Sequence, residues 1–506
     1  MYEQRERFSK ALAACCVLAT LAGVASAREP LPEPQRPRTL VISLDEALRI
    51  AAGESETVWA AEAGVLQAVG SRRIARSAWF PQVSADASYV RTLRSQFQDL
   101  DFGGLGGGEP GEEPAIDLPF GRENQYSLGL SLSQLVFDGG QTAARNRAAA
   151  ARLRSAELDV TSAAAQTLLD VTQAYFDAQL ADRLVQIAEA SLEQSEETLR
   201  QTEVARRVGD KSEYELLRAR VARDNQIPTV VRQRLQSTES YLRLKQLLNV
   251  PPGDQLVLTT GVEEEVPRFA TAADVSPDER APVVQARENV EANEAQLSEA
   301  RGQRLPAVSL SSRFAPVAYP ASGLPEPDDF REDWSVTLSL SVPLLTWGRL
   351  RGNEEVARGG LSQAQARLAQ VREAAVLDAT IARDDLARAR AVLAGNTSTV
   401  QEAERAFGIA RIRFREGIAT QIELDDARLL FEQAQVNRAI ALRDVQAARA
   451  RLALLADLPL SQGSGAPQLI QIQQQPVTQP SPSQPFATAA TGSAVGIVPG
   501  TGGSFP

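Results

Sequence analysis

The sequence predicts an α+β membrane protein in which each chain adds four strands and two long helical hairpins to a shared barrel. Segments 126–137 and 334–344 alternate apolar with small polar residues, as a strand with two different faces does. Stretches 140–209 and 348–417 contain no proline and are long enough for very long helices. The second half repeats the first at an offset of 208 residues, which indicates an internal tandem duplication.

Residues 1–27 have the pattern of a secretory signal peptide. Positive charges come first, an apolar run follows, and an A-x-A motif at 25–27 closes the segment. We do not expect lipidation at Cys15, because almost no apolar stretch precedes it. Cys15 and Cys16 are the two cysteines of the chain, so the mature protein should have no disulfide, catalytic thiol or thiolate metal site.

The remainder divides into two repeats and their connections. Residues 28–43 are expected to be an N-terminal linker, followed by the first structural repeat at 44–251. A second linker at 252–280 leads to the second repeat at 281–459. Residues 460–506 are rich in Gln, Pro, Ser and Gly, which predicts a disordered tail.

Each repeat is expected to begin with a helix, at 44–78 and 281–303, that ends before Pro81 or Pro306. A strand, a loop and a second strand follow. Between its two strands the first repeat is longer by 17 residues, and the extra residues fall in an acidic, glycine-rich loop at 101–119. An insertion there predicts that the loop projects from the fold.

The alternating strands allow two interpretations. They could form the edge of a soluble sandwich, or they could span a membrane with the apolar face toward lipid and the Ser/Thr/Gly face toward a wet lumen. Their length is close to the roughly 9–11 residues of a tilted spanning strand, and Tyr126 and Trp334 stand where an aromatic girdle would lie. The strand pattern alone leaves both interpretations open.

The long helices favour the membrane barrel. Each should run for about 100 Å and then reverse at a glycine into a shorter helix of roughly 40 residues. Apolar residues recur every seven positions, which predicts side-by-side supercoiled helices. Four strands cannot close a barrel, since small barrels need about eight. A symmetric trimer would supply twelve strands, continued by a coiled-coil barrel of helices.

The composition argues against an enzyme. The chain has no histidine and a net charge of −11, which excludes histidine-based catalysis and metal sites and disfavours nucleic-acid binding. Carboxylate pairs such as Asp384-Asp385 lie in charge-rich helices, where solvated faces are usual. We therefore expect no catalytic residue, no metal and no cofactor.

The turns between the long helices, "RRVGDKSEYELLRA" at 206–219 and "RFREGIATQIELDDA" at 413–427, complete a pattern that resembles the TolC family of outer-membrane efflux proteins. The resemblance covers residues 44–459. It implies a homotrimeric, passive export channel in the outer membrane of a Gram-negative bacterium, with a tunnel in the periplasm. The implied partners are a periplasmic adaptor (membrane fusion protein) and an inner-membrane RND or ABC pump.

The resemblance also implies roles for residues at the turns. The Gly-x-x-Ser/Thr tips that would contact the adaptor are Gly209, Ser212, Gly417 and Thr420. The residues expected at the periplasmic constriction are Glu423, Asp426, Glu215 and Phe414, although a favourable interaction with the helix dipole explains Glu215 better than a constriction role does. The best-known members of the family carry a basic latch residue where this chain has Ala419, so a latch here would need other contacts, for which Arg206, Arg207 and Arg415 are candidates. The handover from barrel to tunnel is expected at Gly139, Gly140 and Gly348.

Two other functions remain open from the sequence. Type I protein secretion would use the same channel with a different cargo and pump. A periplasmic coiled-coil structural or adaptor protein would use the helices without entering a membrane. The cargo is not determined by the sequence.

Overall fold

The computed structural model describes residues 38–94, 123–264, 266–269, 276–320 and 324–461. The expected signal peptide, the loop at 101–119 and nearly all of the expected tail lie outside these ranges. The chain divides into two units, Met1–Leu460 and Ser461–Pro506, and the elements described below belong to the first.

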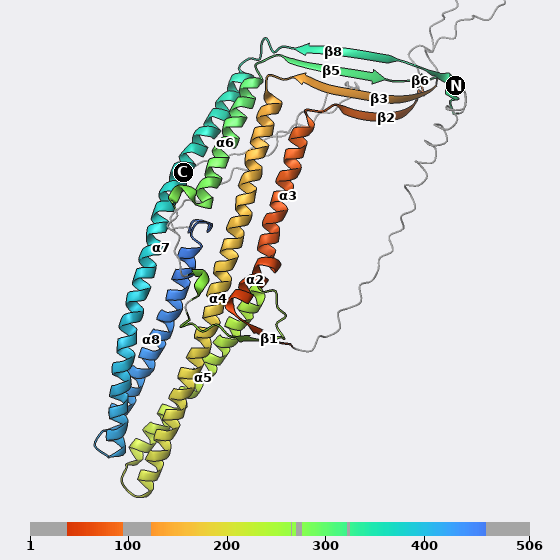
Figure 1. Cartoon of the computed structure of the whole chain (residues 1–506). Helices are drawn as coiled ribbons and strands as arrows, with labels where there is room; N and C mark the ends of the chain where they lie inside the picture. The colour runs from red at the N-terminus through yellow and green to blue at the C-terminus, as the bar shows by residue number, and fades with distance from the viewer. Residues whose placement is uncertain (1–37, 95–122, 265, 270–275, 321–323, 462–506) are drawn as a thin grey trace, which may run out of the picture. The chain divides into compact units, whose positions relative to one another are not determined.

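Long helices dominate the fold. Helices α4 (Gln141–Arg207) and α7 (Arg349–Arg415) each contain 67 residues, which is about 100 Å of helix. Helix α5 (Glu213–Leu247) returns along α4, and α8 (Gln421–Ala453) returns along α7 (Figure 1). The two predicted hairpins are therefore confirmed.

The first predicted helix is wrong in one respect, because it is broken at Ser55. The chain forms α2 (Leu44–Glu54) and α3 (Glu56–Ser77) instead of one helix over 44–78. Ser55 has extended backbone angles, and its Oγ accepts a hydrogen bond from the Val58 N–H at 3.5 Å. The same hydroxyl lies 3.3 Å from Thr167 Oγ1 of α4. An N-cap thus replaces the helical hydrogen bonds at this position. The corresponding helix of the second half, α6 (Ala281–Gly302), is unbroken.

Six of the described strands form one antiparallel sheet. Its four long strands lie in the order β2-β3-β5-β8, and two short strands, β6 and β7, extend it beside β3. The alternation predicted the long strands but not the short ones. The strands are β2 (Gln82–Arg91), β3 (Asn124–Phe137), β5 (Ala307–Phe314), β6 (Val317–Ala318), β7 (Phe330–Arg331) and β8 (Trp334–Ser341).

Strand β8 ends at Ser341, three residues before the predicted end at residue 344. Pro343 follows closely and has no backbone N–H to donate to a neighbouring strand. A 3₁₀ turn, η4 (Pro327–Asp329), precedes β7.

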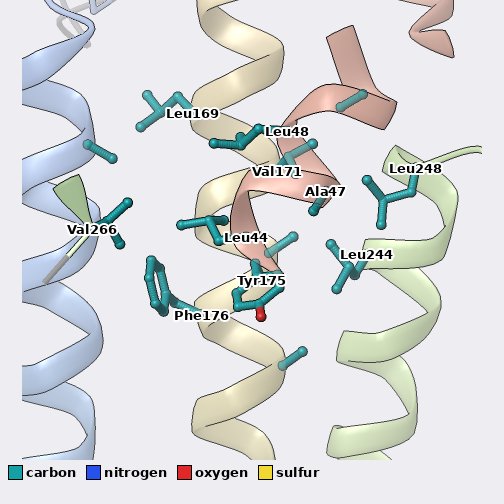
Figure 2. Close-up of a cluster of buried hydrophobic side chains, with 14 of the residues drawn as sticks. Leu44, Ala47, Leu48, Leu169, Val171, Tyr175, Phe176, Leu244, Leu248 and Val266 are labelled. Atoms are coloured by element: carbon teal, nitrogen blue, oxygen red, sulfur yellow. The ribbon is translucent and has the colours of Figure 1, made fainter. Parts of the chain in front are cut away.

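The largest core lies where the two expected linkers meet. Strand β1 (Thr39–Ile42) pairs in parallel with β4 (Gln255–Leu258), and two 3₁₀ turns follow, η2 (Pro267–Phe269) and η3 (Pro277–Glu279). Figure 2 shows buried side chains of this core, which come from α2, α4, α5 and the residue before η2. The labelled members are Leu44, Ala47, Leu48, Leu169, Val171, Tyr175, Phe176, Leu244, Leu248 and Val266.

Tyr175 fixes both expected linkers to α4. Its hydroxyl donates to the Ile42 carbonyl at 3.2 Å and accepts from the Thr260 N–H at 3.0 Å. Gln179, one turn later, donates to the Thr260 carbonyl. The segments 28–43 and 252–280, which the sequence predicts as linkers, thus contain ordered parts of the core.

A buried ion cluster joins α6, α7 and α8. Arg280, immediately before α6, is fully buried and donates to Asp378 Oδ2 at 2.8 Å. Its other nitrogens donate to the carbonyls of Ala375 (3.1 Å) and Leu455 (3.0 Å). Arg451 of α8 donates to the second Asp378 oxygen at 2.8 Å. One carboxylate therefore holds two cations in place.

Candidate functional site

The first tip, between α4 and α5, turns at Gly209, which has φ +86°. Ser212 and Glu215 form a capping box, in which the Ser212 Oγ accepts from the Glu215 N–H at 3.2 Å and the Glu215 carboxylate accepts from the Ser212 N–H at 3.0 Å. The Lys211 ammonium lies 3.0 Å from the same carboxylate. The Ser212 N–H and then Lys211 hold the pKa of Glu215 below its usual value. Glu215 is thus engaged within its own tip.

The second tip, between α7 and α8, turns at Gly417 with φ +72°. Thr420 caps α8 by accepting from the Glu423 N–H at 3.3 Å. The side chains of Glu423 and Asp426 are exposed on the first turns of α8. Ala419, in contrast, is buried.

At both tips a Cβ added to the turning glycine would meet nothing within 4 Å. Gly209 and Gly417 are therefore required by their positive φ and not by crowding within the chain. The space above each turn is open to another molecule.

Side chains join the two tips of the chain. The Lys211 ammonium lies 5.1 Å from the ring centroid of Phe414, which is buried beside Ala419 and Leu424. Gln421, also buried, fits between the two hairpins. In the orientation that satisfies both of its polar atoms, Gln421 donates to the Glu215 carbonyl (3.0 Å) and accepts from the Ala219 N–H (3.1 Å). We call Lys211, Phe414 and Gln421 the tip clasp.

Two further contacts lie above the tip clasp. Arg218 of α5 stands 3.9 Å from Asp425 of α8. Buried Arg428 donates to the Ser191 hydroxyl of α4, and Ser191 donates to Glu432 at 2.7 Å. The second hairpin is thereby attached to the first over several turns.

The junction glycines have different requirements. Gly139 and Gly140 both have positive φ, and Gly348 repeats this at the start of α7. A Cβ on Gly139 would stand 2.5 Å from the Gly302 carbonyl oxygen and 2.6 Å from Leu305 Cβ, whereas Gly140 faces open space. Trp347 has φ +46° and is 90% exposed, an uncommon combination for a bulky side chain.

The sheet keeps its alternation in register across the four long strands. On the first face, one row of paired residues across β2, β3 and β5 is Val83, Leu132 and Ser312. On the second face, the next row is Ser84, Ser131 and Arg313. Cross-strand hydroxyl pairs join Ser84 to Ser131 and Ser88 to Ser127, each at 2.7 Å. Apolar side chains are exposed on the first face, among them Leu128, Leu130, Val336, Leu338 and Leu340.

Among the residues that the structure describes, no group of three or more acidic, Cys or His side chains could hold a metal ion. Within the same residues, no helix combines the length and the apolar character needed to cross a membrane.

The sequence matches the family model described as "Outer membrane efflux protein" over residues 47–250 and 278–456. The chain belongs to this family. The recognition made from the repeated strand, glycine and long helix is thus confirmed. As an outer membrane efflux protein, the chain is a member of a group of channels and not of enzymes.

Solved structures show the same fold. A membrane protein from Pseudomonas aeruginosa is 19% identical, with a TM-score of 0.70 over 84% of this chain and 99% of that one. The CmeC outer membrane channel of Campylobacter jejuni is 18% identical, with a TM-score of 0.69 over 83% and 87%. VceC of Vibrio cholerae is 20% identical, with a TM-score of 0.65 over 82% and 95%. No protein of curated function matches the sequence.

These likenesses confirm the predicted fold class of the efflux protein, a barrel sheet continued by long helices. Sequence reasoning missed Lys211, Gln421, Arg428 and Asp138, whose carboxylate accepts from the Thr142 N–H at 2.6 Å at the start of α4. Lys211 had a visible signal, because it stands two residues past the first glycine, at the position that matches Ala419 after the second.

Proposed function

We propose that three copies of this efflux protein assemble into a passive export channel in the outer membrane of a Gram-negative bacterium. The observation that supports the proposal most is that both edges of the sheet are unpaired within the described chain. Among the described strands, β2 and β8 each have one partner, so both edges of the sheet can pair with another copy. Edge pairing among three copies would close a barrel and leave no exposed edge.

The exposed faces of the sheet support membrane insertion. The Leu and Val face would meet lipid, and the hydroxyl face would line a wet lumen. Aromatic side chains stand near both ends of the strands, as the two membrane interfaces favour. Those at the helix end are Trp79, Phe80, Phe137 and Trp347, and those at the far end are Tyr89, Tyr126 and Trp334.

Exposed apolar stripes on the helices support assembly of the tunnel. On α5 the exposed residues follow a seven-residue repeat, which is the seam of a coiled coil. They are Tyr214, Leu217, Val221, Val231, Leu235 and Leu242. Further exposed apolar residues lie on α7 and α8, including Ile409, Ile412, Ile422, Leu429 and Leu430. A neighbouring copy would remove both sets from water.

We assign the periplasmic constriction to Glu423 and Asp426. Both are exposed on α8 at the tip, so three copies would place six carboxylates around one opening. Glu215 would contribute less, since its carboxylate is engaged by Ser212 and Lys211. The tip clasp would hold this end closed.

The adaptor would dock on the tips at Gly209, Ser212, Gly417 and Thr420, where the space above the glycines is open. An RND or ABC pump would supply the energy to expel small molecules or proteins. Type I protein secretion is the alternative within the same architecture.

Bilayer recording of the purified full-length protein tests the proposal. Wild-type protein should migrate as a trimer and form cation-preferring pores. Glu423→Gln together with Asp426→Asn should weaken cation preference and block by multivalent cations by roughly tenfold, because ringed carboxylates focus the field at a narrow point. Asp385→Asn, a change at a half-buried position of α7 about 30 residues before the tip, is the matched control.

A protein that forms no pore and stays out of the outer-membrane fraction would refute the channel and favour a periplasmic coiled-coil role. Pores with unchanged selectivity in the double variant would leave the channel standing but remove Glu423 and Asp426 from its constriction.

A further inference from the structure

The hydroxyl face of the sheet carries two charges, one in the middle of β2 and one near the end of β5. Most of its other positions on the four long strands are Ser or Thr, which makes the face small and neutral. The hydroxyl residues are Ser84, Ser88, Ser127, Ser131, Ser133, Ser309, Ser311, Ser335, Thr337, Ser339 and Ser341. The charged residues of this face within the same described strands are Asp86 of β2 and Arg313 of β5.

The Asp86 carboxylate lies over the neighbouring strand. Asp86 is paired with Gly129 of β3, and a Cβ built on Gly129 would stand 2.5 and 2.6 Å from the two carboxylate oxygens. The carboxylate therefore occupies the volume that any other residue at 129 would fill. Since β3 lies between β2 and β5, this placement moves the negative charge toward β5.

Arg313 stands beside this position. It pairs with Ser131, two residues along β3 from Gly129 and on the same face. Two residues span about 7 Å along a strand, and adjacent strands lie about 4.8 Å apart. The Asp86 carboxylate and the flexible Arg313 side chain can therefore approach one another across β3.

We propose that Asp86 and Arg313 form a charge-balanced ring in the lumen of the barrel, with Gly129 as the gap that admits the carboxylate. The inference rests on the proposed trimeric channel, in which three copies of the pair would surround the lumen. The opposite face would be a less favourable place for these groups, because a basic side chain facing lipid costs up to about 2–4 kcal/mol, depending on its depth in the membrane. The ring places both signs of charge in the barrel, apart from the carboxylates of the tip, and keeps the net field there small.

Thiol labelling in intact outer membranes tests the ring without requiring the tip to open. Ser84→Cys is the reporter, since Ser84 lies two residues from Asp86 and on the Arg313 row. The reporter thiol is reacted with a cationic and with an anionic methanethiosulfonate reagent, neither of which crosses membranes. The ratio of the cationic to the anionic reaction rate reports the local electric field. Leu130→Cys, on the opposite face, is the matched control, and the parent chain without a reporter gives the background.

Asp86→Asn should lower the cation-to-anion rate ratio by about two- to fourfold, as expected for one unit charge at roughly 10 Å in salt. Arg313→Gln should raise the ratio by a similar factor. The double variant should return it to the parent value, because the two charges cancel. Gly129→Ala, which leaves the charge unchanged but displaces the carboxylate, should also change the ratio.

Unchanged ratios in both single variants, with Ser84→Cys labelled and Leu130→Cys protected, would overturn the ring and leave the channel intact. Labelling of Leu130→Cys to the same extent as Ser84→Cys would overturn the face assignment and with it the ring. Loss of trimers from the outer membrane in the parent protein would instead refute the proposed function.

Discussion

Asp378 offers a direct test of how the second hairpin is held. Its carboxylate accepts from fully buried Arg280 and from Arg451 of α8, each at 2.8 Å. Asp378→Ala would leave the Arg280 guanidinium buried with two carbonyl partners and no counter-charge. Removing one partner of a buried ion pair costs about 3–5 kcal/mol. Arg451 is 30% exposed and can turn to solvent, so we expect a loss of about 3 kcal/mol.

Asp385→Ala is the matched control on the same helix, seven residues later. Asp385 pairs with Arg388 at 2.7 Å, and the Arg388 side chain is 75% exposed. Such a surface pair contributes about 0–1 kcal/mol. Both variants remove one aspartate carboxylate from α7, so they differ mainly in the burial of the partner.

Urea unfolding of the detergent-solubilised protein, followed by helical circular dichroism, measures both free energies. Replacing Arg280 by Met together with Asp378 by Leu should recover much of the loss, because no buried charge is then unpaired. Equal effects of Asp378→Ala and Asp385→Ala, within about 1 kcal/mol, would refute the assignment of a stabilising buried pair. A double variant as unstable as Asp378→Ala would show that packing, not charge, is responsible.

Three further predictions concern the tips and the junction. Lys211→Met should raise the open probability of bilayer pores about two- to fivefold, since a cation–π contact is worth about 0.5–1 kcal/mol. Lys245→Met, a control away from the tips, should leave the open probability unchanged. Equal effects of the two variants would exclude the tip clasp. Burial raises the pKa of the Asp425 carboxyl, against the opposing charges of Arg428 and Arg218. The protonated Asp425 carboxyl therefore contributes to the free energy of unfolding at low pH, and this contribution is lost as the pH rises through the raised pKa. Asp425→Asn should thus leave urea unfolding unchanged near pH 3.5 and stabilise the protein at pH 7; a destabilisation at pH 7 would contradict this sign. Gly139→Ala should lower the free energy of unfolding by about 1–3 kcal/mol more than Gly140→Ala in the same assay. Both glycines have positive φ, but of the two only Gly139 would place a Cβ against the Gly302 carbonyl. Similar losses would mean that the structure relaxes to relieve the crowding at Gly139.

Local signals in the sequence explain which elements could be predicted. Period-two alternation located β3 and β8, and a long stretch without proline located α4 and α7. The break at Ser55 was missed, because the local sequence does not distinguish a serine that caps a second helix from a serine within one continuous helix. The short strands β6 and β7 were missed because two residues are too few for a period.

The core around Tyr175 shows a second limit of local patterns. The segments that hold β1 and β4 lie more than two hundred residues apart and carry weak signals of their own. Their order comes from pairing with each other and from hydrogen bonds to α4. Such long-range partners cannot be deduced from either segment alone.

The sequence by itself determined the class of this efflux protein. Repeat, strand alternation, helix length and turning glycines are local properties, so they identified the family, the hairpins and the two tips. The tertiary structure decided which side chains meet: Lys211 with Phe414, Asp86 with the space over Gly129, and Arg280 with Asp378. These pairs depend on strand register and on the packing of helices distant in sequence. That dependence is why a basic residue at the first tip, and not at the second, became part of the tip clasp.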